Sequence, residues 1–137
     1  MRFLIATAFE HSKDPFENLA LDYIKRTQPL YRPELKQVKA DKLLPVTERS
    51  VRVVFDETGI LQDSVQFARQ LQKFLEQARP VAFLIGPPEG HNPQVRSAAD
   101  KLWSLSKLTL PHKMALCVLA EQIYRSGEIL RNGPYHK

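Results

Sequence analysis

The stretch VAFLIGPPEG at residues 81–90 decides the fold class of this 137-residue chain. Its first five residues, Val81 to Ile85, are all apolar, which is typical of a strand buried on both faces in a parallel sheet. The glycines and prolines of residues 86–90 predict a tight loop at the carboxyl end of that strand. Ligands bind at this edge in open α/β folds, so the stretch indicates either a pocket or a plain turn into a helix. It is neither a P-loop nor a GxGxxG dinucleotide fingerprint.

Strand-like and helix-like segments alternate on both sides of this stretch. Asp14, Pro15 and Glu17 are expected to start a helix as cap, first-turn proline and capping-box partner. The alternation predicts an α/β fold, with a mostly parallel sheet flanked by helices, in one domain of residues 1–137. Apolar and β-branched runs predict further strands at 2–9, 34–40, 51–56 and 102–106. Capping signals and helical spacing predict helices at 14–28, 63–78, 92–100 and 113–131, with a loop or stunted helix at 42–50 and a turn at 56–59.

Composition is that of an ordinary globular protein, with 43% hydrophobic and 26% charged residues. The single cysteine, Cys117, excludes an internal disulfide. Because the histidines and this cysteine lack zinc-site spacing, no metal is expected. The longest apolar stretch, Met114 to Ala120, is too short to cross a bilayer, and the N-terminus has no signal-peptide pattern. We therefore expect a cytoplasmic protein.

The net charge of +5 permits a nucleic-acid partner without requiring one. Between Tyr23 and Lys42 there are two acidic residues and six basic ones: Lys25, Arg26, Arg32, Lys36, Lys39 and Lys42. This run is either an ordinary solvated surface or a patch for RNA phosphates.

Two segments near the C-terminus carry groups suited to a ligand or to RNA. Residues 103–112 alternate leucines with small hydroxyl residues, which suits either a loop around an adenine or an edge strand leading to a helix cap. His112, before the last helix, is expected to cap or pack rather than to catalyse. The ending Tyr135, His136 and Lys137 combines stacking, proton-transfer and phosphate-binding groups, although most chain termini are simply disordered.

The helix that begins at Lys113 is apolar almost all round in its first turns, from Met114 to Ala120. Such a helix is buried on more than one face. In so small a domain, a subunit interface is a reasonable burial partner.

Three segments together resemble the RlmH family, the SPOUT-class methyltransferases that act on N3 of a pseudouridine in 23S ribosomal RNA. They are LIGPPEG at 84–90, LSKLTLPH at 105–112, and AEQIYR at 120–125 with the ending NGPYHK at 132–137. The similarity extends from about Val51 to the C-terminus and is loose before that. The order and spacing of the motifs argue against chance.

The resemblance implies a SPOUT-type α/β knot, whose C-terminal part is threaded as a deep trefoil knot, in a homodimer. It implies S-adenosylmethionine as the cofactor. The implied substrate is 23S rRNA in the large subunit or the assembled ribosome, at a pseudouridine of helix 69 (position 1915 by convention). The cofactor contacts would fall on Phe55, Gly86, Leu105, Ser106, Lys107, Leu108, Thr109 and Leu110.

Methyl transfer to N3 requires loss of the N3 proton, for which a general base would help. His136 is the candidate base, with Tyr135 orienting or stacking on the target, and the pair could serve the partner's cofactor. The alternative is a tail that only grips RNA.

The chain departs from the family pattern at several positions. Pro87 stands in place of a second glycine, Leu116 in place of an arginine, and Phe55 in place of a leucine. The segment Asp41–Ser50 is shorter than usual. The short segment lacks a basic loop and part of a helix, which bears on ribosome docking more than on cofactor binding. A SPOUT methyltransferase for another RNA base, an RNA- or ribosome-binding module without turnover, and a flavodoxin-like nucleotide binder remain alternatives.

Overall fold

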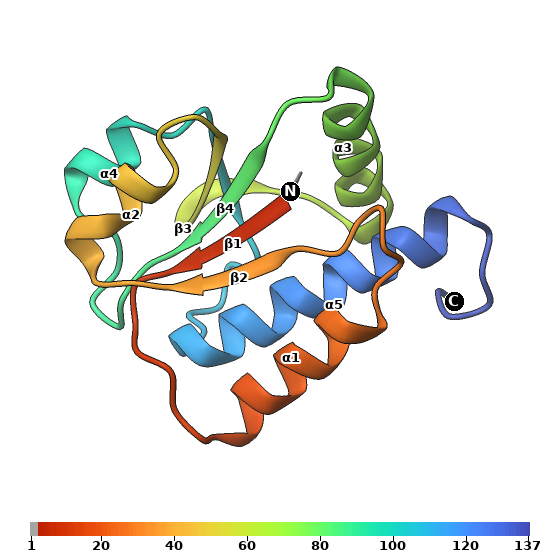
Figure 1. Cartoon of the computed structure of the whole chain (residues 1–137), viewed down its shortest axis with the longest axis horizontal. Helices are drawn as coiled ribbons and strands as arrows, with labels where there is room; N and C mark the ends of the chain where they lie inside the picture. Colours follow the sequence, from red (N-terminus) through yellow and green to blue (C-terminus); the bar gives the residue numbers. More distant parts are fainter. Residues whose placement is uncertain (1–2) are drawn as a thin grey trace.

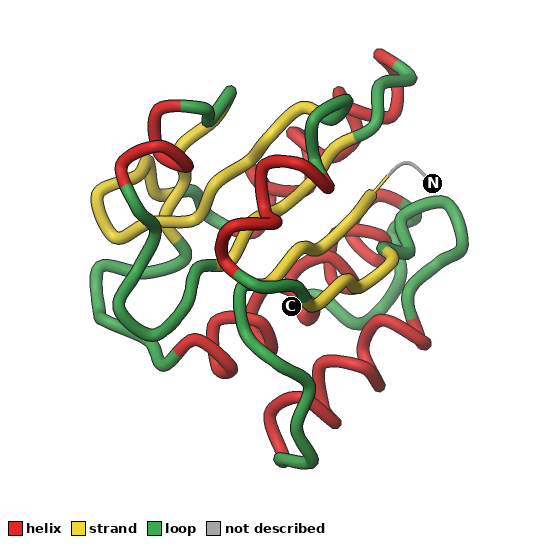
Figure 2. The backbone as a smooth tube through the Cα atoms, turned by 60° about the vertical axis from the view of Figure 1, so that its left-hand side comes forward, coloured by secondary structure: helices red, strands yellow, loops and turns green. Residues whose placement is uncertain are grey.

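The computed structural model describes residues 3–137. Over this range the chain forms a parallel sheet of five strands that lies between helices (Figures 1 and 2). The predicted α/β alternation is thereby confirmed. The strands are β1 (Phe3–Thr7), β2 (Glu34–Gln37), β3 (Val51–Leu61), β4 (Val81–Ile85) and β5 (Lys101–Ser104). The helices are α1 (Pro15–Arg26), α2 (Leu43–Val46), α3 (Ser64–Gln77), α4 (Pro93–Ser97) and α5 (His112–Leu130), with a short 3-10 helix η1 (Ala40–Lys42) before α2.

The strands lie in the order β2-β1-β4-β3-β5, and every neighbouring pair is parallel. The central strand, β4, is buried along its whole length, as its unbroken apolar sequence predicts. Since the strands point the same way, their carboxyl ends meet at one edge of the sheet. The loops that follow β4 and β5 therefore come together at that edge, where open α/β folds bind ligands.

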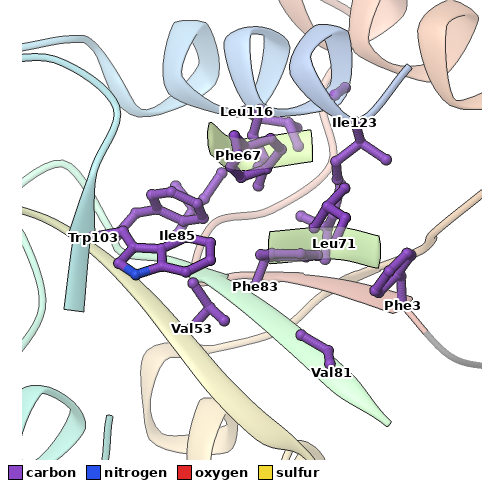
Figure 3. Close-up of a cluster of buried hydrophobic side chains, with 14 of the residues drawn as sticks. Phe3, Val53, Phe67, Leu71, Val81, Phe83, Ile85, Trp103, Leu116 and Ile123 are labelled. Carbon is purple, nitrogen blue, oxygen red and sulfur yellow. The ribbon is translucent and has the colours of Figure 1, made fainter. Parts of the chain in front are cut away.

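Helices cover both faces of the sheet. The helices α1, α3 and α5 pack on one face, and the short α2 and α4 lie on the other (Figure 1). Figure 3 shows the larger core, in which Phe83 and Trp103 of the sheet meet Phe67 of α3. The α5 helix adds a fully buried stripe at helical spacing: Leu116, Leu119, Ala120 and Ile123. Burying one such leucine or isoleucine stabilises the fold by about 1.5–3 kcal/mol.

The strand β3 runs to Leu61, so the predicted turn at residues 56–59 was wrong. After an irregularity that begins at Phe55, Ile60 pairs with Trp103 of β5. Gly59 lies against the backbone of Trp103, where a Cβ atom would come within 2.4 Å of the carbonyl carbon. The glycine therefore marks a close approach of two strands rather than a turn.

The start of α1 was predicted correctly except for its capping box. The Asp14 side chain accepts a hydrogen bond from the Glu17 amide at 2.9 Å, as expected of the cap. The Glu17 carboxylate is buried and accepts instead from the Ser12 amide and from the Gln37 side chain, each at 3.0 Å. It thus ties the loop after β1 to β2. A capping box forms at α3, between Asp63 and Gln66.

The short segment 41–50 folds as the end of η1 and as α2, the stunted helix that was one of the two predictions. Leu43, the first residue of α2, is buried, and Arg52 of β3 donates to the Leu44 carbonyl and to the Thr47 hydroxyl, each at 2.9 Å. The other predicted elements are present with ends shifted by a few residues. Arg2 of the predicted first strand lies outside the described residues.

Candidate functional site

A cavity of about 610 Å³ lies at the carboxyl edge of the sheet, between the loop after β4 and the loop before α5. Lys107 is the one predicted cofactor contact that is not among the described residues lining it. The other predicted cofactor contacts all line it: Phe55, Gly86, Leu105, Ser106, Leu108, Thr109 and Leu110. Residues from three distant parts of the sequence, Phe55, Gly86 and the segment 105–110, therefore line one open cavity.

The loop after β4 is a tight turn. The Gly90 amide donates to the Pro87 carbonyl at 2.8 Å, and Gly90 has a φ of 88°, a conformation that favours glycine. Gly86 is packed closely, since a Cβ atom on it would lie 3.0 Å from the His91 amide nitrogen and 3.1 Å from its Cγ. Asn92 then caps α4 by accepting from the Val95 amide. The turn holds Gly86 against the cavity, and a larger side chain there would require His91 and Gly90 to shift.

The serines of the loop before α5 shape the loop itself. The Ser104 hydroxyl donates to the Ser106 carbonyl at 2.7 Å, and the Ser106 hydroxyl accepts from the Leu108 amide at 2.9 Å. Three leucines of the same loop, Leu105, Leu108 and Leu110, line the cavity. Leu108 is the most exposed of them, at 76% of its accessible surface. The serine hydroxyls thus fix the backbone of the loop, and its leucine side chains give the cavity an apolar surface.

Several polar residues that line the cavity were not predicted from the sequence, among them Asp56, His91 and Arg96. Arg96 lies 3.7 Å from the Asp56 carboxylate and donates to the His91 carbonyl at 2.7 Å. The His91 ring is buried, with Nε2 3.2 Å from the Leu84 carbonyl and Nδ1 without a hydrogen-bond partner among the described residues. Burial lowers the pKa of His91, and its Leu84 contact and Asp56 oppose that change. In the sequence, only the position of Asp56 at the carboxyl end of a predicted strand pointed to a site residue.

His112 lines the cavity at the start of α5 and packs edge-on against Phe9 at 4.5 Å between ring centroids, so the packing role predicted for it is confirmed. Burial lowers the pKa of His112, and the neighbouring Lys113 adds to this. Lys113 pairs with Asp14 at 2.6 Å. Its hydrogen bond lowers the pKa of Asp14 to about 2, so this carboxylate is ionised at neutral pH. The loop after β1 is thereby fastened to the helix that borders the cavity.

The tail residues Tyr135 and His136 lie elsewhere. Of the described residues, neither lines the cavity, and Figure 1 shows the C-terminus beyond the far end of α5. Tyr135 donates to the Glu121 carboxylate at 2.7 Å, and the His136 Nδ1 lies 3.0 Å from the Arg125 Nη1. Ala115 of α5 borders the cavity, and ten residues of helix separate it from Arg125 by about 15 Å. Within one chain, the structure does not bring the tail to the cavity.

The described residues show neither a candidate metal centre nor a membrane-spanning helix. Among residues 3–137, no three or more His, Cys, Asp or Glu side chains are grouped so that they could hold a metal ion. In the same range, no helix has the length and apolar character needed to span a membrane.

Comparison with known proteins gives a consistent picture. A family model described as "Predicted SPOUT methyltransferase" matches residues 1–136. The curated "Ribosomal RNA large subunit methyltransferase H" of Gemmatimonas aurantiaca is 40% identical over 129 residues, which cover 93% of this chain and 77% of that protein. The protein of the same name from Polynucleobacter asymbioticus is 34% identical, with 100% of this chain and 99% of that protein covered.

Solved structures agree at the level of the fold. The crystal structure of a probable methyltransferase from Bordetella pertussis Tohama I has a TM-score of 0.61 at 16% identity, covering 91% of this chain and 93% of that one. A probable methylase family protein from Haemophilus influenzae Rd KW20 has a TM-score of 0.65 at 10% identity, covering 98% and 70%. From the family model and the relatives together, the chain belongs to the SPOUT methyltransferases, within the ribosomal RNA large subunit methyltransferase H family.

Proposed function

We propose that this protein methylates N3 of a pseudouridine in helix 69 of 23S rRNA, with S-adenosylmethionine as the methyl donor. The name of its relatives supports an rRNA substrate. The observation that carries the proposal is the cavity in which Gly86 meets the leucine-rich loop of residues 105–110. A substrate in the large subunit or the assembled ribosome implies a cytoplasmic location.

The residues of the cavity fit this cofactor. A volume of about 610 Å³ falls within the range of small-molecule sites, roughly 300–1,000 Å³. Leu105 and Leu110 offer apolar surface to an adenine ring, and the carboxylates of Asp56 and Glu57 can accept hydrogen bonds from an ammonium or from ribose hydroxyls. When bound, S-adenosylmethionine supplies an electrophilic methyl group on a sulfonium.

The chain itself supplies position and hydrogen bonds. Holding N3 of the base in line with the methyl group provides much of the rate in a displacement of this kind. Burial and the hydrogen bond to Glu121 raise the pKa of Tyr135, so its phenol stays protonated; since its one O–H is donated to Glu121, the ring serves the base by stacking. The predicted role of His136 as the base for the N3 proton requires a ring nitrogen with a free lone pair facing N3.

A homodimer completes the proposed site. The tail of one chain lies about 15 Å along α5 from its own cavity, which favours a tail that serves the cavity of the partner. Met114 and Val118 of α5 are only half-buried in the single chain, and Leu108 is exposed, so apolar surface is available for a second copy. The C-terminal trefoil knot implied by the resemblance belongs to this proposal as well.

The basic segment between Lys25 and Lys42 is the predicted surface for RNA phosphates. All six basic residues between Lys25 and Lys42 are exposed, which supports a role in binding phosphates.

Leu116 is fully buried in the core, so the position where the family commonly has an arginine makes no RNA contact here. Pro87 provides a carbonyl to the turn before Gly90 but has no N–H to donate.

The test is methyl transfer from labelled S-adenosylmethionine to ribosomes that lack this modification, followed by mapping of the labelled nucleotide. We expect label on N3 of the helix 69 pseudouridine. Label on another base would show that the proposed target nucleotide is wrong but would keep the assignment as an RNA methyltransferase. Absence of transfer together with absence of cofactor binding by calorimetry would leave an RNA-binding module.

A further inference from the structure

The tail is held on α5 by a defined set of contacts rather than lying loose. The Tyr135 hydroxyl donates to Glu121 Oε2 at 2.7 Å. Its ring packs edge-on against Tyr124, with 4.7 Å between centroids, and the Arg125 guanidinium carbon lies 4.7 Å from the centre of the same ring. The conformation of the residue that follows, His136, is therefore set by groups on α5.

Arg125 connects these contacts to His136. Its Nε and Nη2 donate to Glu121 Oε2 at 3.1 and 2.8 Å, which fixes the plane of the guanidinium. The remaining Nη1 lies 3.0 Å from Nδ1 of His136. The orientation of the imidazole is thus determined through a chain of three side chains.

The chemistry of arginine decides the tautomer. A guanidinium carries five N–H donors and no acceptor. In its contact with Arg125, Nδ1 of His136 must therefore accept the hydrogen bond with its lone pair. A neutral imidazole carries its proton on the other nitrogen, so Nε2 is an N–H donor. With Nδ1 occupied and Nε2 protonated, neither nitrogen has a lone pair to take the N3 proton.

We propose that Glu121 and Arg125 are positioning residues that present His136 as an Nε2–H hydrogen-bond donor to a carbonyl oxygen of the target base. This refines the proposed function and rests on it. The N3 proton passes to solvent first, and the imide anion that remains then forms the N3–methyl bond as the sulfur–methyl bond breaks. The negative charge that develops on the imide is shared with the oxygens beside N3. A fixed donor at one of these oxygens stabilises that charge.

The tautomer can be measured without any substrate. In the full-length protein with ¹⁵N-labelled histidine, two-bond ¹H–¹⁵N correlation spectra at neutral pH should show His136 with Nδ1 unprotonated and Nε2 protonated. Arg125→Met should shift the Nδ1 resonance, because the accepted hydrogen bond is lost, whereas Arg96→Met at the cavity should leave it in place. A protonated Nδ1 in the native protein would overturn the proposal.

The role in transfer is tested with two substitutions of one residue. Glutamine can donate a hydrogen bond from its amide but cannot act as a base at neutral pH. We expect His136→Ala to lower kcat roughly a hundredfold, as loss of one charge-stabilising donor does, and His136→Gln to recover most of that loss with KM little changed. Equal inactivity of the two variants would return His136 to the role of base and end the donor proposal.

The two proposals fail separately. If the native protein transfers no methyl group to any rRNA, the proposed function falls and the donor role at a base oxygen falls with it, while the spectra still decide the tautomer. If the native protein is active and Arg125→Met is fully active too, the methyltransferase assignment stands and the positioning role of Arg125 is overturned.

Discussion

Gly59 of β3 and Trp103 of β5 approach so closely that a Cβ atom on the glycine would lie 2.4 Å from the tryptophan carbonyl carbon. The atoms it would meet are backbone, so β5 must move to admit a methyl group. We expect Gly59→Ala to lower the free energy of unfolding by about 1–3 kcal/mol, as overpacking does. Urea unfolding measures this. Glu57→Ala, on the same strand but exposed, is the control and should change stability by less than about 0.5 kcal/mol.

The same pair of strands shows what the sequence could predict. Val51 to Phe55 and Val81 to Ile85 are strands because of their own residues, and both were predicted. The extension of β3 past Gly59 depends on Trp103, which is 44 positions away in the sequence. Glu17 is a similar case, since its carboxylate is directed by Gln37 of β2 rather than by its own helix. Local patterns specify elements, whereas long-range contacts decide where they end.

Some residues of the candidate site could likewise be predicted from the sequence, and others could not. Gly86 and the loop of residues 105–110 were identified from the motifs of the family, and the structure places all but Lys107 around one cavity. Asp56, His91 and Arg96 come from three segments, and only the folded chain brings them together. The separation between the tail and the cavity could not be predicted either, because it depends on the direction of α5 relative to the sheet.

Gly86 gives a direct test of the cavity as the cofactor site. Its first side-chain atom would already lie 3.0 Å from the His91 amide nitrogen, so Gly86→Val must displace the loop or enter the cavity. We expect S-adenosylmethionine to bind at least about tenfold more weakly, a loss of about 1.4 kcal/mol, by isothermal titration calorimetry. Unchanged affinity in a folded variant would remove Gly86 from the site. Ala98→Val, beyond the cavity at the end of α4, is the control.

Leu110 and Lys107 test which of the proposed cofactor contacts bind S-adenosylmethionine. Leu110 lines the cavity, and Lys107 is not among its described lining residues. Loss of most of a leucine side chain from an apolar contact is worth about 1–2 kcal/mol. Leu110→Ala should therefore weaken S-adenosylmethionine binding by roughly tenfold, while Lys107→Ala should change it by less than about twofold. The opposite ranking in calorimetry would contradict the lining of the cavity as described.

His91 predicts a pH dependence of stability. Burial holds its pKa below the ordinary 6.5, with Arg96 acting in the same direction and Asp56 against it. Below pH 6.5 the unfolded chain binds a proton that the folded chain does not, so stability falls as pH falls from that value toward the folded pKa. The loss at pH 5.5 is at most about 1.4 kcal/mol. Urea unfolding at pH 7.5 and 5.5 should show a smaller difference for His91→Leu than for the native protein, and equal differences would rule His91 out.

The tail of one chain can serve either its own cavity or the cavity of the partner, and these two arrangements predict different results for variants. A chain that ends at Pro134 keeps every cavity residue, so it should bind S-adenosylmethionine normally and transfer methyl groups poorly. Full activity of this truncation would end any role for Tyr135 and His136. If the tail serves the partner's cavity, mixed dimers of the truncated chain and Gly86→Val contain one intact cavity facing one intact tail. At an S-adenosylmethionine concentration too low to fill the Gly86→Val cavity, activity should then rise on mixing the two impaired variants under conditions that allow subunit exchange. If each tail serves its own cavity, neither chain in the mixed dimer has both parts, and mixing restores nothing.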